Sequence, residues 1–334
     1  MKKLVADYVS HITMGTEQRY RNMTVFPLLC DRESPVDYLL LDEALDAQLI
    51  NITEVGESGR VPELKVENRS DRNLLILDGE ELVGAKQNRI VNVTILIAAH
   101  ASLTIPVSCV EQGRWSYQSQ RFMSKERVMP PRMRMRKSAA VYSSLVNNGT
   151  YEGNQGETWN LIHEKMTGLG VSSQTGALGD IYDNQHDVID EYLKHFIVED
   201  RQTGMLVTIN NQVIGCDCFA RHDTLKKTFP KLIKSYVLDA IDVHAGKKMT
   251  AAAGSHASPF LEDVRSCLTQ ERPSLSLGTD IRLVSQTVIG SALAINDEII
   301  HLTAFVRDEK DTGRKTGFYQ RASRRKAHTG TEIE

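Results

Sequence analysis

Apolar residues alternate with other residues along two neighbouring segments, and this period of two is the strongest constraint on how the chain can fold. The alternating apolar positions are Val91, Val93, Ile95 and Ile97 in the first segment and Leu103, Ile105, Val107 and Cys109 in the second. Such a period is typical of β-strands that bury one face. The stretch 90–110 is uncharged and long enough to cross a membrane, but its alternation and its residues Asn92, His100 and Pro106 indicate strands instead.

The two segments predict an antiparallel hairpin with a defined register. Residues 98–102 form the loop. The apolar residues of one segment face those of the other only if the numbers of two paired residues add up to an even value. A five-residue loop makes this sum 200, so that 97 pairs with 103 and 91 pairs with 109. Carried outward, the register sets Arg89 opposite Glu111 in an ion pair, Gln87 opposite Gly113 and Ala85 opposite Trp115. The alternative is that the two segments lie in opposite sheets of a sandwich.

This register brings together two polar runs that form the candidate site. The first extends from Leu77 to Arg89 and the second from Glu111 to Trp115. Carboxylates can act as general bases, arginine and lysine can hold a phosphate, amides can bind a sugar or a base edge, and tryptophan can stack on a ring. The candidate catalytic residues are Glu80, Glu81 and Glu111, and the candidate ligand-binding residues are Lys86, Gln87, Asn88, Arg89, Arg114 and Trp115. The structural alternative is that these residues serve the turn alone, and no metal site is indicated.

The chain is expected to fold as an α+β protein. Short apolar segments at 25–30, 38–41, 64–68 and 73–77 predict a strand-rich, β-sandwich-like lobe over residues 1–120. Residues 121–137 carry seven cations against one anion and include Pro130-Pro131, so residues 121–155 are expected to be a basic linker or loop. Residues 156–308 are expected to form a mixed α+β lobe, and residues 309–334 a basic, disordered tail.

Several elements of the second lobe have clear sequence signals. Asn210-Asn211 predicts a hairpin with a two-residue type I′ turn, and a second hairpin is expected around Asn296-Asp297. Apolar residues from Phe229 to Ile241 follow a helical rhythm, with Thr228 as the expected N-cap and Pro230 just inside the helix. Further helices are expected around 188–196 and over 259–268. Residues 172–176 could donate hydroxyls to a ligand or only cap and turn the chain.

Composition favours a cytoplasmic globular protein. The 334 residues carry a formal net charge of -3, which gives no basic field for nucleic acid. The basic start of the chain reaches Asp7 before the apolar region of a signal peptide can form. The cysteines are expected to be reduced core thiols. Cys216 and Cys218 share one strand face, with Asp217 on the other, and are expected to lie in the core rather than to hold a metal.

A set of short motifs is distinctive when its members are taken together. It comprises Gly79-Glu-Glu81, Gly84-Ala-Lys-Gln-Asn-Arg89, Ile105-Pro-Val107, Cys109-Val-Glu111, Gly113-Arg-Trp115, Trp159, Ser173-Gln-Thr175, Gly215, Asp217, Phe219 and the helix from Phe229 to Ala240. These motifs resemble a prokaryotic family named for its association with ADP-ribosylglycohydrolases and with rhodanese or phosphatase-superfamily proteins. The resemblance covers most of residues 25–306. It implies a link to NAD or ADP-ribose metabolism through neighbouring genes, and it assigns no catalytic residue.

Site and resemblance together predict binding of a phosphorylated or ribose-containing small molecule, such as ADP-ribose or a related nucleotide, with processing of that ligand left open. In a hydrolase, one of the three glutamates would be the general base, and Lys86, Arg89 and Arg114 would hold the phosphate. The alternative is a noncatalytic scaffold or protein-interaction module, in which the basic linker or tail binds a partner protein. No membrane or nucleic-acid partner is expected, and the sequence does not indicate a cofactor.

Overall fold

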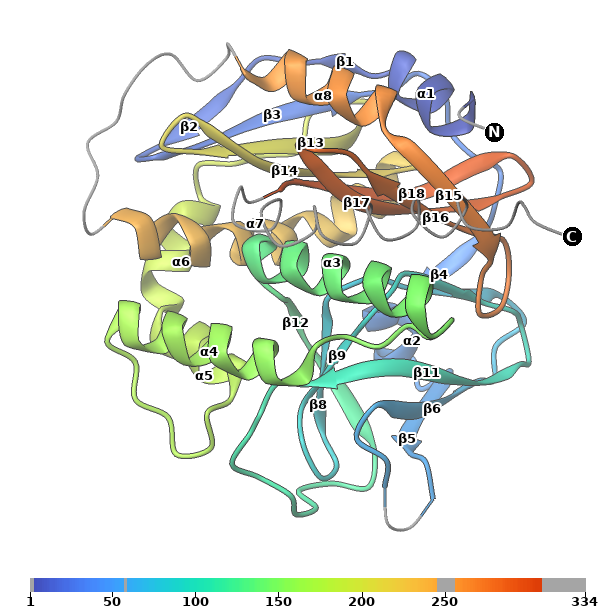
Figure 1. Cartoon of the computed structure of the whole chain (residues 1–334), viewed down its shortest axis with the longest axis vertical. Coiled ribbons are helices and arrows are strands. Elements are labelled where there is room, and N and C mark those ends of the chain that lie inside the picture. The colour runs from blue at the N-terminus through green and yellow to red at the C-terminus, as the bar shows by residue number, and fades with distance from the viewer. Residues whose placement is uncertain (1–2, 57–58, 245–255, 308–334) are drawn as a thin grey trace, which may run out of the picture.

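The computed structural model describes residues 3–56, 59–244 and 256–307, and their strands form three sheets (Figure 1). A nine-stranded sheet with helices on both faces crosses the upper part of Figure 1, and two smaller sheets form the strand-rich part at lower right. The protein is therefore α+β, as predicted. The tail expected at 309–334 lies outside the described residues.

The nine-stranded sheet is antiparallel throughout and combines strands from both ends of the chain. Its order is β1 (Thr13–Met14), β3 (Met23–Leu29), β13 (Gln202–Ile209), β14 (Gln212–Phe219), β18 (Glu298–Val306), β17 (Val288–Ile295), β16 (Thr279–Val284) and β15 (Leu268–Pro273), with β2 (Gln18–Tyr20) beside β3. Both predicted hairpins are present. Asn210 and Asn211 have φ of 51° and 63°, and Asn296 and Asp297 have φ of 51° and 61°. Asparagine and aspartate tolerate this left-handed region better than most side chains do.

Helices cover the two faces of this sheet. On one face α1 (Lys3–Ser10) and α8 (Ala257–Ser266) enclose an apolar cluster that includes Cys216 and Cys218, so the predicted core position of these cysteines is confirmed. On the other face lie α3 (Pro131–Asn147) and α7 (His222–His244), with α4 (Gln155–Leu169), α5 (Leu178–Asn184) and α6 (His186–Leu193) beyond them (Figure 1). Asp217 points toward α3, which places a buried carboxylate between the sheet and the helices.

The strand-rich part consists of two sheets that share one apolar core with α2 (Leu41–Asp46). The six-stranded sheet has the order β12 (Phe122–Val128), β8 (Glu80–Gly84), β9 (Arg89–Val91), β11 (Ser102–Cys109), β6 (Glu63–Asn68) and β5 (Ile50–Glu54). The three-stranded sheet has the order β10 (Ile95–Ile97), β7 (Asn73–Ile76) and β4 (Tyr38–Leu40). Six of the eight alternating apolar residues lie in this core, as their period predicted: Val91, Val93, Ile95, Ile97, Ile105 and Val107. Leu103 packs against the core partly buried, and Cys109 is buried outside it.

The predicted pairing of the two segments is only half right. β9 pairs with β11, but Val91 faces Val107 and Arg89 faces Cys109, so the register is shifted by two residues from the predicted one. β10 does not continue this hairpin. The chain turns at residues 92–94 and enters the other sheet, where Ile95 pairs with Ile76 of β7. Alternation fixes which face is buried, and a shift by two keeps that face, so the apolar pattern could not distinguish the two registers.

The prediction that residues 121–155 form a basic linker or loop is wrong. These residues form β12, the helix α3 and the start of α4. Two of their cations, Arg134 and Lys137, are 1% and 3% exposed, because buried carboxylates neutralise them. Residues remote in sequence supply those carboxylates, and therefore the local charge run misled the prediction.

Helix α7 begins at His222, seven residues before Phe229, where its apolar rhythm predicted the start. Thr228 therefore lies inside the helix, where its hydroxyl donates to Thr224 O at 2.8 Å instead of capping the N-terminus. Pro230 likewise lies in the interior rather than in the first turn. The polar first turns of the helix gave no apolar signal.

Candidate functional site

The two polar runs meet where the turn between β8 and β9 lies against the end of β11. The backbone N–H of Val110 donates to Asn88 O at 3.0 Å. The Gln87 side-chain amide donates to Glu111 O at 2.8 Å, and the backbone N–H of Asn88 donates to Glu111 Oε2 at 3.1 Å. The predicted proximity of the two runs is confirmed, and their contact residues are called the turn cluster below (residues 84–89 and 109–115).

Arg114 holds the turn cluster together from within. Its Nε and Nη2 donate to the two Glu111 carboxylate oxygens at 2.8 and 2.6 Å. The same guanidinium donates to Asn88 Oδ1 and to the backbone oxygens of Gly84, Ala85 and Ser116. Burial raises the pKa of Glu111, but the hydrogen bonds from Arg114 and Asn88 outweigh it, and the pKa is lowered. Glu111 is therefore an ionised structural partner of Arg114 and a weak general base.

Arg89 does not pair with Glu111, which corrects the prediction. Its side chain is 0% exposed, and its Nη1 donates to Gln87 Oε1 at 2.9 Å. Its Nη2 lies 3.8 Å from Glu54 Oε1. Arg89 Nε and Nη2 and Glu54 Oε2 have no hydrogen-bond partner, and burial lowers the pKa of the guanidinium. The two-residue shift puts Cys109 where Glu111 was expected and leaves Arg89 with an incomplete set of acceptors.

The outer side of the turn cluster is formed by Lys86 and Trp115. The Trp115 side chain is 48% exposed, and its ring centroid lies 5.5 Å from Arg89 Cζ and 5.5 Å from Lys86 Nζ. The backbone N–H of Lys86 donates to Glu54 Oε1 at 3.3 Å. The half-exposed tryptophan ring thus lies against the buried guanidinium.

Glu80 and Glu81 have different partners. Glu80 pairs with Lys231 of α7, which also binds Asp42 at 2.6 Å, and burial raises the Glu80 pKa. Glu81 is 0% exposed, and neither of its carboxylate oxygens has a hydrogen-bond partner. The nearest cation is Arg127, whose Nη1 lies 3.9 Å from Glu81 Oε2, and burial raises the pKa of Glu81 to about 7.

Sequence reasoning missed two residues at the turn cluster. Glu54 follows Ile50 and Ile52 at the third buried position of β5, and a carboxylate continuing an apolar alternation was an available signal. Gln155 of α4 exchanges hydrogen bonds with the backbone of Cys109, both at 2.7 Å, for which the sequence gave no signal.

The segment 172–176 also reaches the cluster. The backbone N–H of Gly113 donates to Thr175 O at 2.7 Å, and Ser173 Oγ accepts hydrogen bonds from the backbone N–H of Gly176 and Ala177. In the structure this serine turns the chain, which is one of the two roles considered for it.

A second group of buried charges lies between the nine-stranded sheet and the strand-rich part. Arg134 of α3 donates to both Asp217 carboxylate oxygens at 2.8 and 3.2 Å, and its Nε lies 3.7 Å from Asp78. Lys137, one turn further along α3, binds Asp78 and the backbone oxygen of Val91. Burial lowers the Lys137 pKa to about 8, against the opposing effect of Asp78. Two cations of one helix thereby tie the end of β7 to β14.

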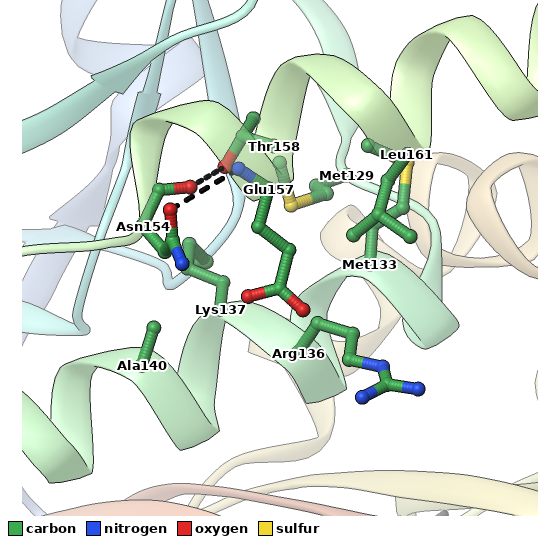
Figure 2. Close-up of a pocket in the computed structure, with 9 residues that line it drawn as sticks. All are labelled: Met129, Met133, Arg136, Lys137, Ala140, Asn154, Glu157, Thr158 and Leu161. Atoms are coloured by element: carbon green, nitrogen blue, oxygen red, sulfur yellow. Dashed lines mark hydrogen bonds between the residues drawn. The ribbon is translucent and has the colours of Figure 1, made fainter. Parts of the chain in front are cut away.

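Three hollows among the described residues lie away from the turn cluster. Figure 2 shows a crevice between α3 and α4 that is too narrow for a water molecule and is lined by Met129, Met133, Arg136, Lys137, Ala140, Asn154, Glu157, Thr158 and Leu161. A surface groove of about 410 Å³ lies beside Asp37 and Arg72, and a smaller hollow of about 130 Å³ lies beside Tyr8 and Cys30. None of the nine candidate site residues lines these three hollows.

Two further properties concern the described residues as a whole. Within ranges 3–56, 59–244 and 256–307, no three or more His, Cys, Asp or Glu side chains gather in a way that could hold a metal ion. In the same ranges, no helix is both long and apolar enough to span a membrane.

Fold and site define an α+β protein with a buried, charged turn cluster at one end of an antiparallel sheet. The chain belongs to the family of the ARG and Rhodanese-Phosphatase-superfamily-associated Protein domain, whose model matches residues 11–305. Comparison with curated proteins and with solved structures gave no match. The family name associates the domain with ARG and rhodanese-phosphatase proteins and describes no reaction.

Proposed function

We propose that the chain binds a phosphorylated or ribose-containing small molecule at the turn cluster. The observation that carries this proposal is the Arg89 guanidinium, of which two nitrogens lack a hydrogen-bond partner although the side chain is 0% exposed. Buried polar groups are normally hydrogen-bonded, and a buried charge without partners is costly. A phosphate oxygen or a ribose hydroxyl would supply the missing acceptors.

A ligand would reach Arg89 past Trp115. The ring centroid of Trp115 lies 5.5 Å from the guanidinium carbon, and the side chain is half-exposed. Rotation of this one side chain would open a path without disturbing the hydrogen bonds of Arg114. Binding is therefore expected to change the surroundings of Trp115.

The proposal is one of binding rather than hydrolysis. Of the three candidate bases, Glu81 has the pKa that suits acid–base chemistry near neutral pH, at about 7. However, Arg89 pairs with Leu82 across the sheet, and Glu81 is the neighbour of Leu82 in the strand. Adjacent residues of a strand point to opposite faces, so Glu81 and Arg89 leave opposite faces of the sheet. The family name supports a ligand related to ADP-ribose, because it associates the domain with ARG proteins.

A thermal-shift panel tests the proposal. The ligands are ADP-ribose, NAD, ribose 5-phosphate and inorganic phosphate, and a ligand present at 100 times its Kd should stabilise the folded protein by about 2.7 kcal/mol. The variant Arg89→Met with Glu54→Gln removes both buried charges together, so that neither is left unpaired, and it should abolish the shift. The matched control is Arg265→Met with Glu262→Gln, which removes an exposed pair joined at 2.6 Å on α8 and should keep the shift.

The noncatalytic alternative is favoured by one specific observation. All three nitrogens of the Arg114 guanidinium donate to protein oxygens, as those of a purely structural residue would. If no ligand of the panel shifts the melting temperature, or if the shift persists in Arg89→Met/Glu54→Gln, the turn cluster is not a binding site and the scaffold alternative takes its place.

A further inference from the structure

Two exposed aromatic side chains stand beside the turn cluster. Trp115 and Tyr117 belong to the loop between β11 and β12 and are 48% and 53% exposed. Single exposed apolar residues are common on protein surfaces. These two differ because they flank the same cation: Lys86 Nζ lies 5.5 Å from the Trp115 ring centroid and 4.9 Å from that of Tyr117. We call Trp115, Tyr117 and Lys86 the aromatic ledge.

The ledge is held in place by its backbone. Arg114 directly precedes Trp115. Its guanidinium donates to Ala85 O at 2.7 Å and to Ser116 O at 3.0 Å. The backbone N–H of Gln118 donates to Ala85 O at 2.9 Å, and the backbone N–H of Ala85 donates to Ser119 Oγ at 3.0 Å. The loop is thus fastened to the β8–β9 turn on both sides of Tyr117.

The chemistry of the ledge is that of a stacking platform beside positive charge. Exposed indole and phenol rings bind flat aromatic rings, and such stacking tolerates any base because every base has a π-face. Lys86 at the rings and Arg89 behind Trp115 place two cations next to the platform. A sugar phosphate would use only the cations, whereas a nucleotide would use the rings as well.

We propose that the ligand of the turn cluster is a nucleotide whose base stacks on the aromatic ledge while its phosphate is bound by Lys86 and Arg89. This inference rests on the proposed function and narrows its ligand class from phosphorylated or ribose-containing small molecules to nucleotides. Base stacking on an aromatic side chain strengthens binding by roughly ten-fold or more. AMP should therefore bind at least roughly ten-fold more tightly than ribose 5-phosphate, which has the same phosphate and no base.

Tryptophan fluorescence provides the test, because the chain holds two tryptophans. The variant Trp159→Phe leaves Trp115 as the only reporter. Titration with AMP should quench the emission of Trp115 saturably. Ribose 5-phosphate should need a higher concentration than AMP to saturate its thermal shift. Tyr117→Ala in the Trp159→Phe background should make the affinities for AMP and for ribose 5-phosphate similar. Trp115→Ala, whose binding is measured by calorimetry, should have the same effect. Met123→Ala, which truncates an exposed side chain on β12, is the control and should keep the preference for AMP.

The outcomes separate this inference from the proposed function. If AMP and ribose 5-phosphate bind equally well to the wild-type protein, and binding is lost in Arg89→Met/Glu54→Gln, the phosphate site stands and the nucleotide inference is overturned. A preference for AMP that survives both aromatic substitutions also overturns it, since the base would then lie elsewhere. Failure of every ligand to bind overturns both.

Discussion

Replacing Glu81 with glutamine should change how the stability of the protein depends on pH. Glu81 is fully buried, and neither carboxylate oxygen accepts a hydrogen bond. Arg127 lies 3.9 Å away but binds the exposed Asp183 instead of closing on Glu81. Burial therefore dominates and raises the pKa to about 7, so the folded protein keeps a proton that the unfolded chain has released.

The direction of this pH dependence follows from the linkage between proton binding by Glu81 and folding. Below pH 4.5 both states hold the proton and Glu81 carries no penalty. Between the ordinary pKa of 4.5 and the folded pKa of about 7 the folded state binds more protons, so the free energy of unfolding falls as the pH rises. Each pKa unit corresponds to about 1.4 kcal/mol, so the complete penalty above pH 7 is about 3 kcal/mol. Glutamine has nearly the same shape and no charge, and it removes this penalty.

Urea denaturation followed by circular dichroism at pH 5, 6, 7 and 8 measures the effect. The free energy of unfolding of Glu81→Gln minus that of the wild type should rise by about 3 kcal/mol from pH 5 to pH 8. Glu164→Gln, an exposed substitution on α4 with the same change of charge, should give a difference that does not vary with pH. If Glu81→Gln instead becomes the less stable protein at pH 8, the carboxylate is charged and paired with Arg127, and the reasoning fails.

Two other substitutions test how the surroundings of the buried Arg134 contribute to stability. Asp217→Asn should lower the free energy of unfolding by about 3–5 kcal/mol, because it leaves Arg134 buried without its carboxylate, whereas Glu262→Gln on the surface should change it by less than about 1 kcal/mol. Gly79→Ala should lower it by about 1–3 kcal/mol, since Gly79 has a φ of 88° and an added Cβ would lie 3.1 Å from Arg134 Cδ. Unchanged urea midpoints would mean that Arg134 finds other partners or that the backbone relaxes at Gly79.

The features that the sequence predicted well are set by local stereochemistry. A pair of turn-forming side chains between two alternating runs fixed the hairpin at Asn210-Asn211, because these residues tolerate positive φ. The same logic placed five residues of β9, β10 and β11 on one buried face: Val91, Ile95, Ile97, Ile105 and Val107. Each of these predictions needs only a few consecutive residues.

The features that it did not predict depend on residues far away. The exact register of β9 against β11 depends on where the chain leaves the sheet at Asn92, whose backbone N–H donates to Pro106 O at 3.0 Å. The basic run at 121–137 folds because Asp217, 83 residues beyond Arg134, supplies its counter-charge. Alternation and charge counting carry no information on such contacts. For that reason the proximity of the two polar runs was predicted correctly, whereas the ion pair between Arg89 and Glu111 was assigned wrongly.

The two arginines of the turn cluster differ in their capacity for further bonds, and this difference bears on what the cluster is for. Arg114 and Glu111 satisfy each other, and the remaining donors of Arg114 bind backbone oxygens, so neither residue has capacity for a ligand. Arg89 has one hydrogen bond from its guanidinium, to Gln87, and a carboxylate at 3.8 Å whose second oxygen is also unpaired. A cluster built only for stability would gain by satisfying both arginines, since an unmade buried hydrogen bond costs about 1–3 kcal/mol. The saturated arginine therefore ties the turn to Glu111 and the neighbouring backbone, and the unsaturated one is the residue at which we propose that a ligand binds.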